Sequence, residues 1–204
     1  MKKADIWQIT MEEEMEQIRL TYENLDKRAF MLAVQMICRA RHIYIMGVRD
    51  SMPMAAFLSS QLALVSDNLH FLNSSGSREL LEQMLHIGER DVIIGISFPP
   101  YSIRTLKALE FASERKASVI TISDDAMAPI HLYSSCKLIA GIGAAQTPYS
   151  LAAPMSLMYL LAREICRKKR KKVARTLEEM EYVREKYQVF DRDGMDFFPF
   201  PKKE

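Results

Sequence analysis

Five short apolar runs, each followed by a stretch with helical spacing, constrain the fold of this chain most strongly. The runs lie at 42–46, 69–72, 91–96, 118–122 and 137–141. Most of their residues are apolar without alternation, which is typical of strands buried on both faces in a parallel sheet. The helical stretches lie at 51–65, 77–85, 103–115 and 148–169. The pattern therefore predicts an α/β protein, a three-layer α-β-α sandwich around a five-stranded parallel sheet.

The first 40 residues are expected to be helical and to precede this unit. An apolar stripe with spacings of three and four runs along them, formed by Trp7, Met11, Met15, Ile18, Tyr22 and Leu25. The stripe packs either on its own domain or on a second subunit. A charged helix and a tail with Phe197, Phe198 and Phe200 are expected to end the chain. We thus expect a helical linker or dimerisation segment at 1–40, the α/β domain at 41–170, and a C-terminal helix and tail at 171–204.

Composition excludes several classes of protein. The formal net charge of the 204 residues is +2, too small for nucleic-acid binding by the whole surface. The basic run at 163–175 closes a long helix, so we interpret it as a solvated helix face. The three cysteines, at 38, 136 and 166, are too few and too far apart for a disulfide framework or a zinc site. With no long apolar run and no signal peptide, we expect a cytoplasmic protein without a membrane partner.

Small hydroxyl residues follow two of the predicted strands. The first strand ends at Gly47 and leads through Arg49 to Ser51, and the third leads through Ser97 to Ser102. In doubly wound sheets, ligands bind beyond the carboxyl ends of the strands at the switch point. Free backbone N–H groups and the positive ends of helix dipoles meet there, and both suit a phosphate group. The alternative for these loops is a pair of capped helices without a ligand.

Individual residues of the first loop suit this chemistry. Gly47 permits a tight turn or a close backbone approach. The Arg49 guanidinium can donate two hydrogen bonds to a phosphate, or it can pair with Asp50 on the surface. Ser51 is placed to cap the next helix and to donate its hydroxyl to a ligand.

In the second loop, Ser102 is expected to cap the helix that begins near residue 103. Pro99 and Pro100 remove two backbone N–H donors from the loop, so Arg49 and Arg104 would have to compensate. Asp124 and Asp125 follow a further strand and lie on the same edge, where they bind a ligand or cap the next helix.

Together the two loops resemble those of the sugar isomerase (SIS) domain. The family's first signature, G-x-G-x-S, stands here as Gly47-Val48-Arg49-Asp50-Ser51. Its second, S-x-S-G-x-T, stands here as Ser97-Phe98-Pro99-Pro100-Tyr101-Ser102. The chain looks closest to the effector domain of RpiR-family bacterial transcription regulators, of which a subgroup carries S-F-P-R-Y-S. The resemblance covers about residues 25–170, with Arg49 in place of the second glycine and the two prolines in place of Ser-Gly.

This resemblance implies a flavodoxin-like fold that binds a phosphorylated sugar or sugar derivative, without a cofactor or a metal ion. It implies that the ligand is held by Gly47, Arg49, Ser51, Ser97, Tyr101 and Ser102. It further implies the ligand-sensing part of an RpiR-type regulator, as a homodimer or tetramer. DNA would be contacted only through a helix-turn-helix head domain, and the 204 residues contain no segment that resembles one.

Two alternatives remain at this point. The first is a stand-alone aldose–ketose phosphosugar isomerase, which needs a general base near the carbonyl carbon of the sugar. The candidates are Glu164 and His86, and neither lies in a recognisable catalytic motif. The second alternative is an oligomerisation scaffold whose site has decayed. The missing base favours binding over catalysis, and the presence of both hydroxyl loops argues against decay.

Overall fold

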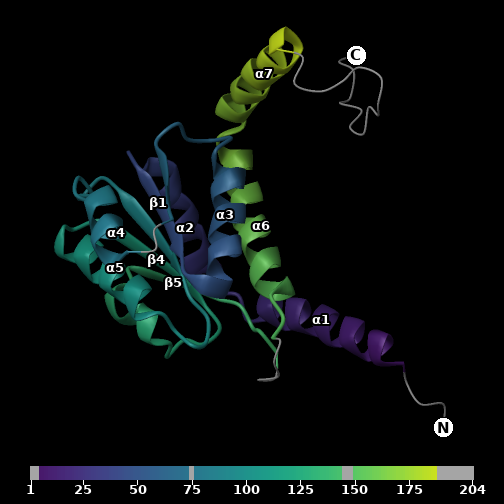
Figure 1. Ribbon diagram of the computed structural model, residues 1–204. Helices are drawn as coiled ribbons and strands as arrows, with labels where there is room; N and C mark the ends of the chain where they lie inside the picture. Colours follow the sequence, from purple (N-terminus) through teal and green to yellow (C-terminus); the bar gives the residue numbers. More distant parts are fainter. Residues whose placement is uncertain (1–4, 74–75, 144–148, 188–204) are drawn as a thin grey trace.

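A single sheet of five parallel strands forms the centre of the protein, in the order β2-β1-β3-β4-β5. The computed structural model describes residues 5–73, 76–143 and 149–187. The strands are β1 (Ile43–Gly47), β2 (Leu69–Leu72), β3 (Val92–Ile96), β4 (Ser118–Ser123) and β5 (Cys136–Ile139). Helices cover both faces of the sheet (Figure 1), so the predicted three-layer α/β fold is confirmed. Each predicted strand coincides with an observed one to within two residues at either end.

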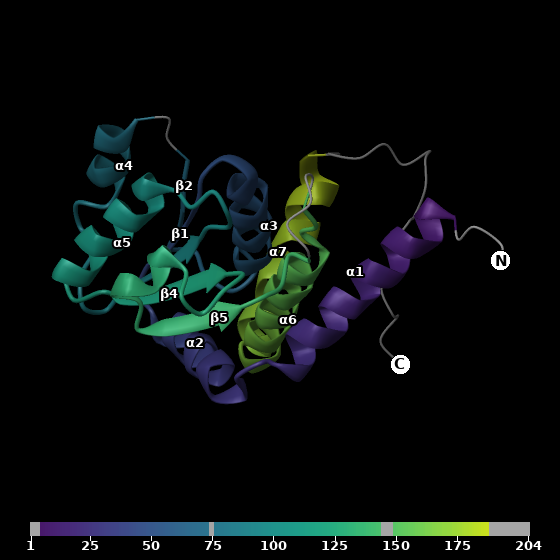
Figure 2. The same ribbon diagram turned by 90° about the horizontal axis from the view of Figure 1, so that it is seen from below.

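Three helices cover one face of the sheet: α2 (Lys27–Arg39), α3 (Met52–Leu62) and α6 (Ala152–Lys168). Their apolar sides, with Leu58 and Leu161 fully buried, meet alternate side chains of the strands in the larger core cluster. The other face carries α4 (Ser77–Gln83), α5 (Ile103–Glu114) and a short 3-10 helix, η2 (Pro129–Tyr133). Figure 2 shows these two layers from below. Because every residue of β3 is buried, both layers are needed to exclude water from the sheet.

Close packing of α5 depends on a glycine in the middle of β3. A Cβ atom at Gly95 would lie 2.8 Å from the Leu109 side chain. Gly95 pairs with Met46 of β1 and Thr121 of β4, so it lies in the centre of the sheet. The missing side chain therefore sets the distance between α5 and the strands whose ends form the ligand edge.

Two further helices extend from the domain, α1 (Ile6–Glu23) and α7 (Arg170–Tyr187), and neither buries a residue. Figure 1 shows them at opposite ends of α6. The inner end of α1 is held to the domain because the Thr21 hydroxyl accepts a hydrogen bond from the Gly141 N–H at 3.1 Å. The outer stripe is uncovered, with Trp7 77% exposed and Met11 and Met15 more than half exposed. The tail phenylalanines Phe197, Phe198 and Phe200 lie outside the described residues.

The amino edge of the sheet is held by a buried carboxylate. Asp91 accepts two hydrogen bonds from the Arg41 guanidinium, at 3.0 and 2.9 Å, and further ones from the N–H groups of His42 and Gly88. Burial is the largest single influence on the pKa of Asp91 and would raise it. The bonds from Arg41 and Gly88 together outweigh burial and hold that pKa below its ordinary value.

Candidate functional site

The two hydroxyl-bearing loops leave neighbouring strands in opposite directions. β1 and β3 are paired, with Gly47 opposite Ile96 at their carboxyl ends. The chain after β1 continues into α3 on one face of the sheet, and the chain after β3 continues into α5 on the other. This is the switch point of a 2-1-3-4-5 sheet, where a crevice opens between the two loops.

Gly47 fixes the path of the first loop. A Cβ atom at this position would lie 2.2 Å from the carbonyl oxygen of Ser51 and 2.6 Å from its carbonyl carbon. The chain folds back over Gly47 in a 3-10 turn at Arg49–Ser51, closed by a bond of 3.2 Å from the Ser51 N–H to the Val48 carbonyl. Only glycine allows this close approach of backbone to backbone.

Arg49 adopts a left-handed backbone conformation, with φ of 56°. A side chain in this region costs about 1 kcal/mol, and glycine avoids the cost. Arg49 occupies the position of the second glycine in the SIS signature, so the chain keeps the backbone shape while adding a guanidinium.

Ser51 does not cap α3, contrary to the expectation from sequence. Its φ and ψ of −83° and −12° are helical, whereas a side-chain cap requires an extended residue, and its hydroxyl makes no capping hydrogen bond. Ser51 is buried beneath the loop, at 4% exposure. Its hydroxyl is therefore held close to Gly47 and Arg49.

The second loop is ordered by its own serines. The buried Ser97 hydroxyl accepts a hydrogen bond from the Ser102 N–H at 3.1 Å. The Ser102 hydroxyl in turn accepts one from the Thr105 N–H at 3.3 Å, which confirms Ser102 as the cap of α5. Between them, the Pro99–Pro100 peptide bond is cis. One orphan N–H at the start of α5 is thus satisfied, and the two prolines contribute no donor.

Tyr101 joins this loop to the end of β4. Its hydroxyl donates to Asp124 Oδ1 at 3.0 Å, and the Ser123 hydroxyl lies 3.1 Å from the same oxygen. Burial, followed by the bond to Asp124, raises the pKa of Tyr101 to about 12. Asp125 instead accepts a bond from the Met127 N–H and shapes the turn before η2, so neither aspartate caps that helix.

A second tyrosine joins the first loop to the segment before α6. The Tyr149 hydroxyl donates to Asp50 Oδ2 at 3.2 Å. Burial, and then the nearby carboxylate of Asp50, raises the pKa of Tyr149. The two tyrosines thus act as neutral donors that brace the loops on both sides of the switch point.

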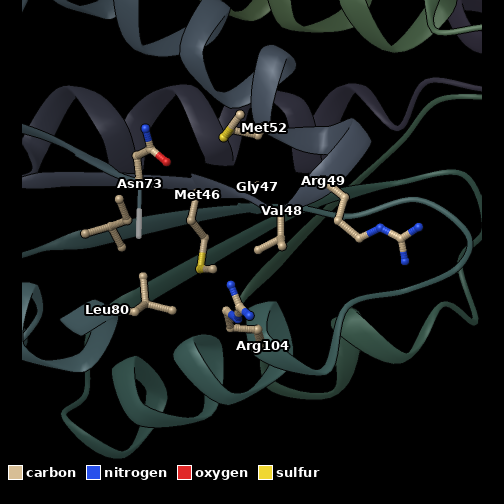
Figure 3. A pocket seen from close by; sticks show the side chains of 9 residues that line it. Met46, Gly47, Val48, Arg49, Met52, Asn73, Leu80 and Arg104 are labelled. Atoms are coloured by element: carbon tan, nitrogen blue, oxygen red, sulfur yellow. The ribbon is translucent and has the colours of Figure 1, made fainter. Parts of the chain in front are cut away.

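An open pocket of about 220 Å³ adjoins the first loop. Its lining residues are Met46, Gly47, Val48, Arg49, Met52, Leu72, Asn73, Leu80 and Arg104. Figure 3 shows Met46 and Arg104 reaching the same space from opposite sides, with Asn73 and Leu80 at one end and Arg49 at the other. The pocket therefore continues from the hydroxyl loops toward β2 and α4.

The residues expected to hold the ligand fall into two groups. Gly47 and Arg49 line the pocket. Ser51, Ser97, Tyr101 and Ser102 lie in the loops beside it and are not among its lining residues.

The two candidate bases lie elsewhere. Glu164 is three turns along α6 and pairs with Arg167 at 2.7 Å, and His86 is an exposed residue before β3, at the opposite edge of the sheet. The structure therefore brings neither base to the loops.

Several lining residues were missed by reasoning from the sequence. Leu72 and Asn73 end β2, and Leu80 lies on α4. They reach the pocket because β2 pairs with β1 at the edge of the sheet, and strand order is not visible in a single sequence. Among the described residues, no three side chains of metal-binding type lie close enough to hold a metal ion together.

The family model that describes the SIS domain matches residues 36–163, which is most of the chain. The chain belongs to the SIS domain family. Its matched range contains both loops and every residue that lines the pocket. Curated protein sequences gave no match to the chain.

Several solved structures share the SIS fold. The sugar isomerase domain of an RpiR transcription factor from Sphaerobacter thermophilus has a TM-score of 0.81 at 23% identity, over 87% of this chain and 98% of its own. The Vibrio vulnificus NanR protein complexed with ManNAc-6P has a TM-score of 0.78 at 15% identity, over 93% of this chain and 72% of its own. An Escherichia coli CFT073 protein in complex with arabinose 5-phosphate has a TM-score of 0.62 at 13% identity, over 93% and 98%. These low identities establish the fold alone.

None of the helices in the described ranges is long and apolar enough to cross a membrane.

Proposed function

We propose that this SIS domain binds a phosphorylated sugar at the carboxyl edge of its sheet and senses it without transforming it. The observation that carries the proposal is the juxtaposition of two hydroxyl-bearing loops and Arg49 at the β1/β3 switch point. Two structures of the same fold are described as complexes with ManNAc-6P and arabinose 5-phosphate, which supports a sugar phosphate as the ligand class.

The phosphate would lie between the two loops. Ser51 does not cap α3, and in this proposal its hydroxyl bonds a phosphate oxygen together with Ser97 and Ser102. Gly47 lets the backbone approach, Tyr101 braces the second loop, and Arg49 supplies the charge that Pro99 and Pro100 cannot supply through backbone N–H groups. A charged, bidentate donor is stronger than the neutral amides it would replace.

Sensing is favoured over aldose–ketose isomerisation by the positions of the two candidate bases. A base must come within hydrogen-bond reach of the carbon-bound proton it removes. Glu164 is engaged by Arg167 on the outer part of α6, and His86 lies at the opposite edge of the sheet. Asp124 lies nearer but already accepts the Tyr101 hydroxyl.

We also propose that the domain acts in a cytoplasmic transcription regulator of RpiR type, as a homodimer or tetramer. In such a protein, DNA contacts belong to a helix-turn-helix domain and not to the SIS domain. The exposed stripe of α1 supports an oligomer, because monomers seldom expose a contiguous apolar patch. Light scattering at micromolar concentration should give at least twice the chain mass of 23.5 kDa, and a monomer would contradict this part.

A screen of sugar phosphates tests the ligand class. Thermal stability should rise with at least one of glucose 6-phosphate, fructose 6-phosphate, N-acetylmannosamine 6-phosphate or arabinose 5-phosphate, and not with the unphosphorylated parent sugar. NMR of the incubated sugars should show no interconversion. Equal responses to both forms would refute phosphate recognition, and turnover lost in Glu164→Gln or His86→Ala would make the protein an isomerase.

A further inference from the structure

The pocket beside the hydroxyl loops is unusually rich in carbon for a sugar site. Five of its side chains are apolar: Met46, Val48, Met52, Leu72 and Leu80. Met46, Leu72 and Leu80 are each at most 3% exposed, so they form a fixed floor. Asn73 lies at the rim as the one uncharged polar side chain among the described residues that line the pocket.

This composition disfavours an unmodified sugar ring. A ring that carries a hydroxyl on every carbon would place hydroxyl groups against Met and Leu side chains, where they lose water without gaining a partner. The pocket's volume of about 220 Å³ is below the roughly 300–1,000 Å³ of sites that enclose a whole drug-sized ligand. It therefore suits one substituent of a ligand whose polar part lies on the adjoining loops.

Charge narrows the substituent further. No carboxylate is among the described lining residues, whereas Arg49 and Arg104 are. A free ammonium group would thus meet cations and no anion. A neutral amide fits better, because the Asn73 side chain can both donate to an amide carbonyl and accept from an amide N–H.

We propose that the ligand is an N-acylated amino-sugar phosphate whose acyl group lies in the pocket formed by Met46, Met52, Leu72, Asn73 and Leu80. The inference rests on the proposed function, since the loops must hold the phosphate of the same molecule. The acyl methyl contacts the apolar floor, and the amide faces Asn73 at the rim (Figure 3).

Matched ligands test the inference by calorimetry on the full chain. N-acetylated hexosamine 6-phosphates of the gluco and manno series are compared with the free-amine and hydroxyl forms of the same sugars. Burying one methyl and forming one amide hydrogen bond predict binding about tenfold tighter for the N-acetyl form in at least one series. If the hydroxyl or amine form binds as tightly in both series, the acyl pocket is refuted.

A pair of methionine variants locates the effect. Met52 lines the pocket and is 40% exposed, so Met52→Gln should fold normally while reducing the N-acetyl preference from about tenfold to roughly threefold or less. Met127→Gln is the matched control, because Met127 is 88% exposed and lies outside the pocket. An unchanged preference in Met52→Gln overturns the placement.

The two proposals fail differently. If sugar phosphates bind without an N-acetyl preference, only the acyl pocket is wrong. If no sugar phosphate binds at all, the proposed function is wrong, and the acyl pocket is wrong with it.

Discussion

Gly47→Ala should disrupt the site by forcing two backbone segments apart. An alanine Cβ would lie 2.2 Å from the Ser51 carbonyl oxygen, and ordinary contact begins at 3.4 Å. The turn over Gly47 would therefore have to move by about 1.2 Å, the difference between those two distances. Because the obstacle is backbone and cannot change rotamer, we expect a cost of about 3 kcal/mol, at the upper end for overpacking.

Two assays measure the consequence of Gly47→Ala. In a chain of this length, a cost of that size lowers the melting temperature by roughly 6–12 °C. Ser51 and Arg49 move with the turn, so sugar phosphate affinity should fall about tenfold or more, as expected when a hydrogen bond to a charged group is lost.

Gly88→Ala is the matched control for this substitution. Nothing lies within 4 Å of a Cβ at Gly88, and alanine keeps the N–H that donates to Asp91. Its stability should stay within about 0.5 kcal/mol of the wild type. The reasoning is refuted if Gly47→Ala melts and binds like the control.

Three further substitutions test other parts of the account. Arg49→Gly should leave the melting temperature unchanged or higher, because glycine accepts φ of 56°, yet weaken sugar phosphate binding about tenfold; a stability loss without an affinity loss would contradict the role of Arg49. Tyr101→Phe should cost about 1.5 kcal/mol in urea unfolding, since the Asp124 carboxylate loses a donor, and an unchanged midpoint would contradict that contact. The pKa of Asp91 is below its ordinary value of 3.8 in the folded state, so the stability it contributes is full above about pH 4 and is lost as the pH falls through the folded-state pKa. Asp91→Asn should cost about 2 kcal/mol at pH 7 and flatten that acid decline; a parallel decline in the variant would show that other groups cause it.

The local parts of the fold could be predicted from the sequence. Unbroken apolar runs such as 92–96 give buried strands wherever they lie, and serine before a helix gives a cap when its backbone is extended, as at Ser102. Ser51 failed this rule because the left-handed Arg49 starts a turn early and leaves Ser51 helical. No sequence rule anticipates that conformation at an arginine.

The non-local parts could not be predicted. The pocket depends on β2 lying beside β1, which brings Leu72 and Asn73 to the loop after Gly47. In sequence they are 25 residues from that loop, and their apolar or amide side chains carry no motif. Likewise Tyr149 reaches Asp50 only because α6 packs on the same face as α3.

Methyl NMR of the methionines tests the central claim most directly, because methionines lie both in and far from the site. Met46 and Met52 line the pocket, whereas Met11 lies on α1 and Met127 lies in the exposed turn before η2. Titration with the sugar phosphate that stabilises the protein most should shift the Met46 and Met52 methyl signals and leave Met11 and Met127 in place. The unphosphorylated parent sugar at the same concentration should shift none of them. Shifts confined to Met11 or Met127, or equal shifts with the unphosphorylated sugar, would contradict a phosphosugar site at the β1/β3 switch point.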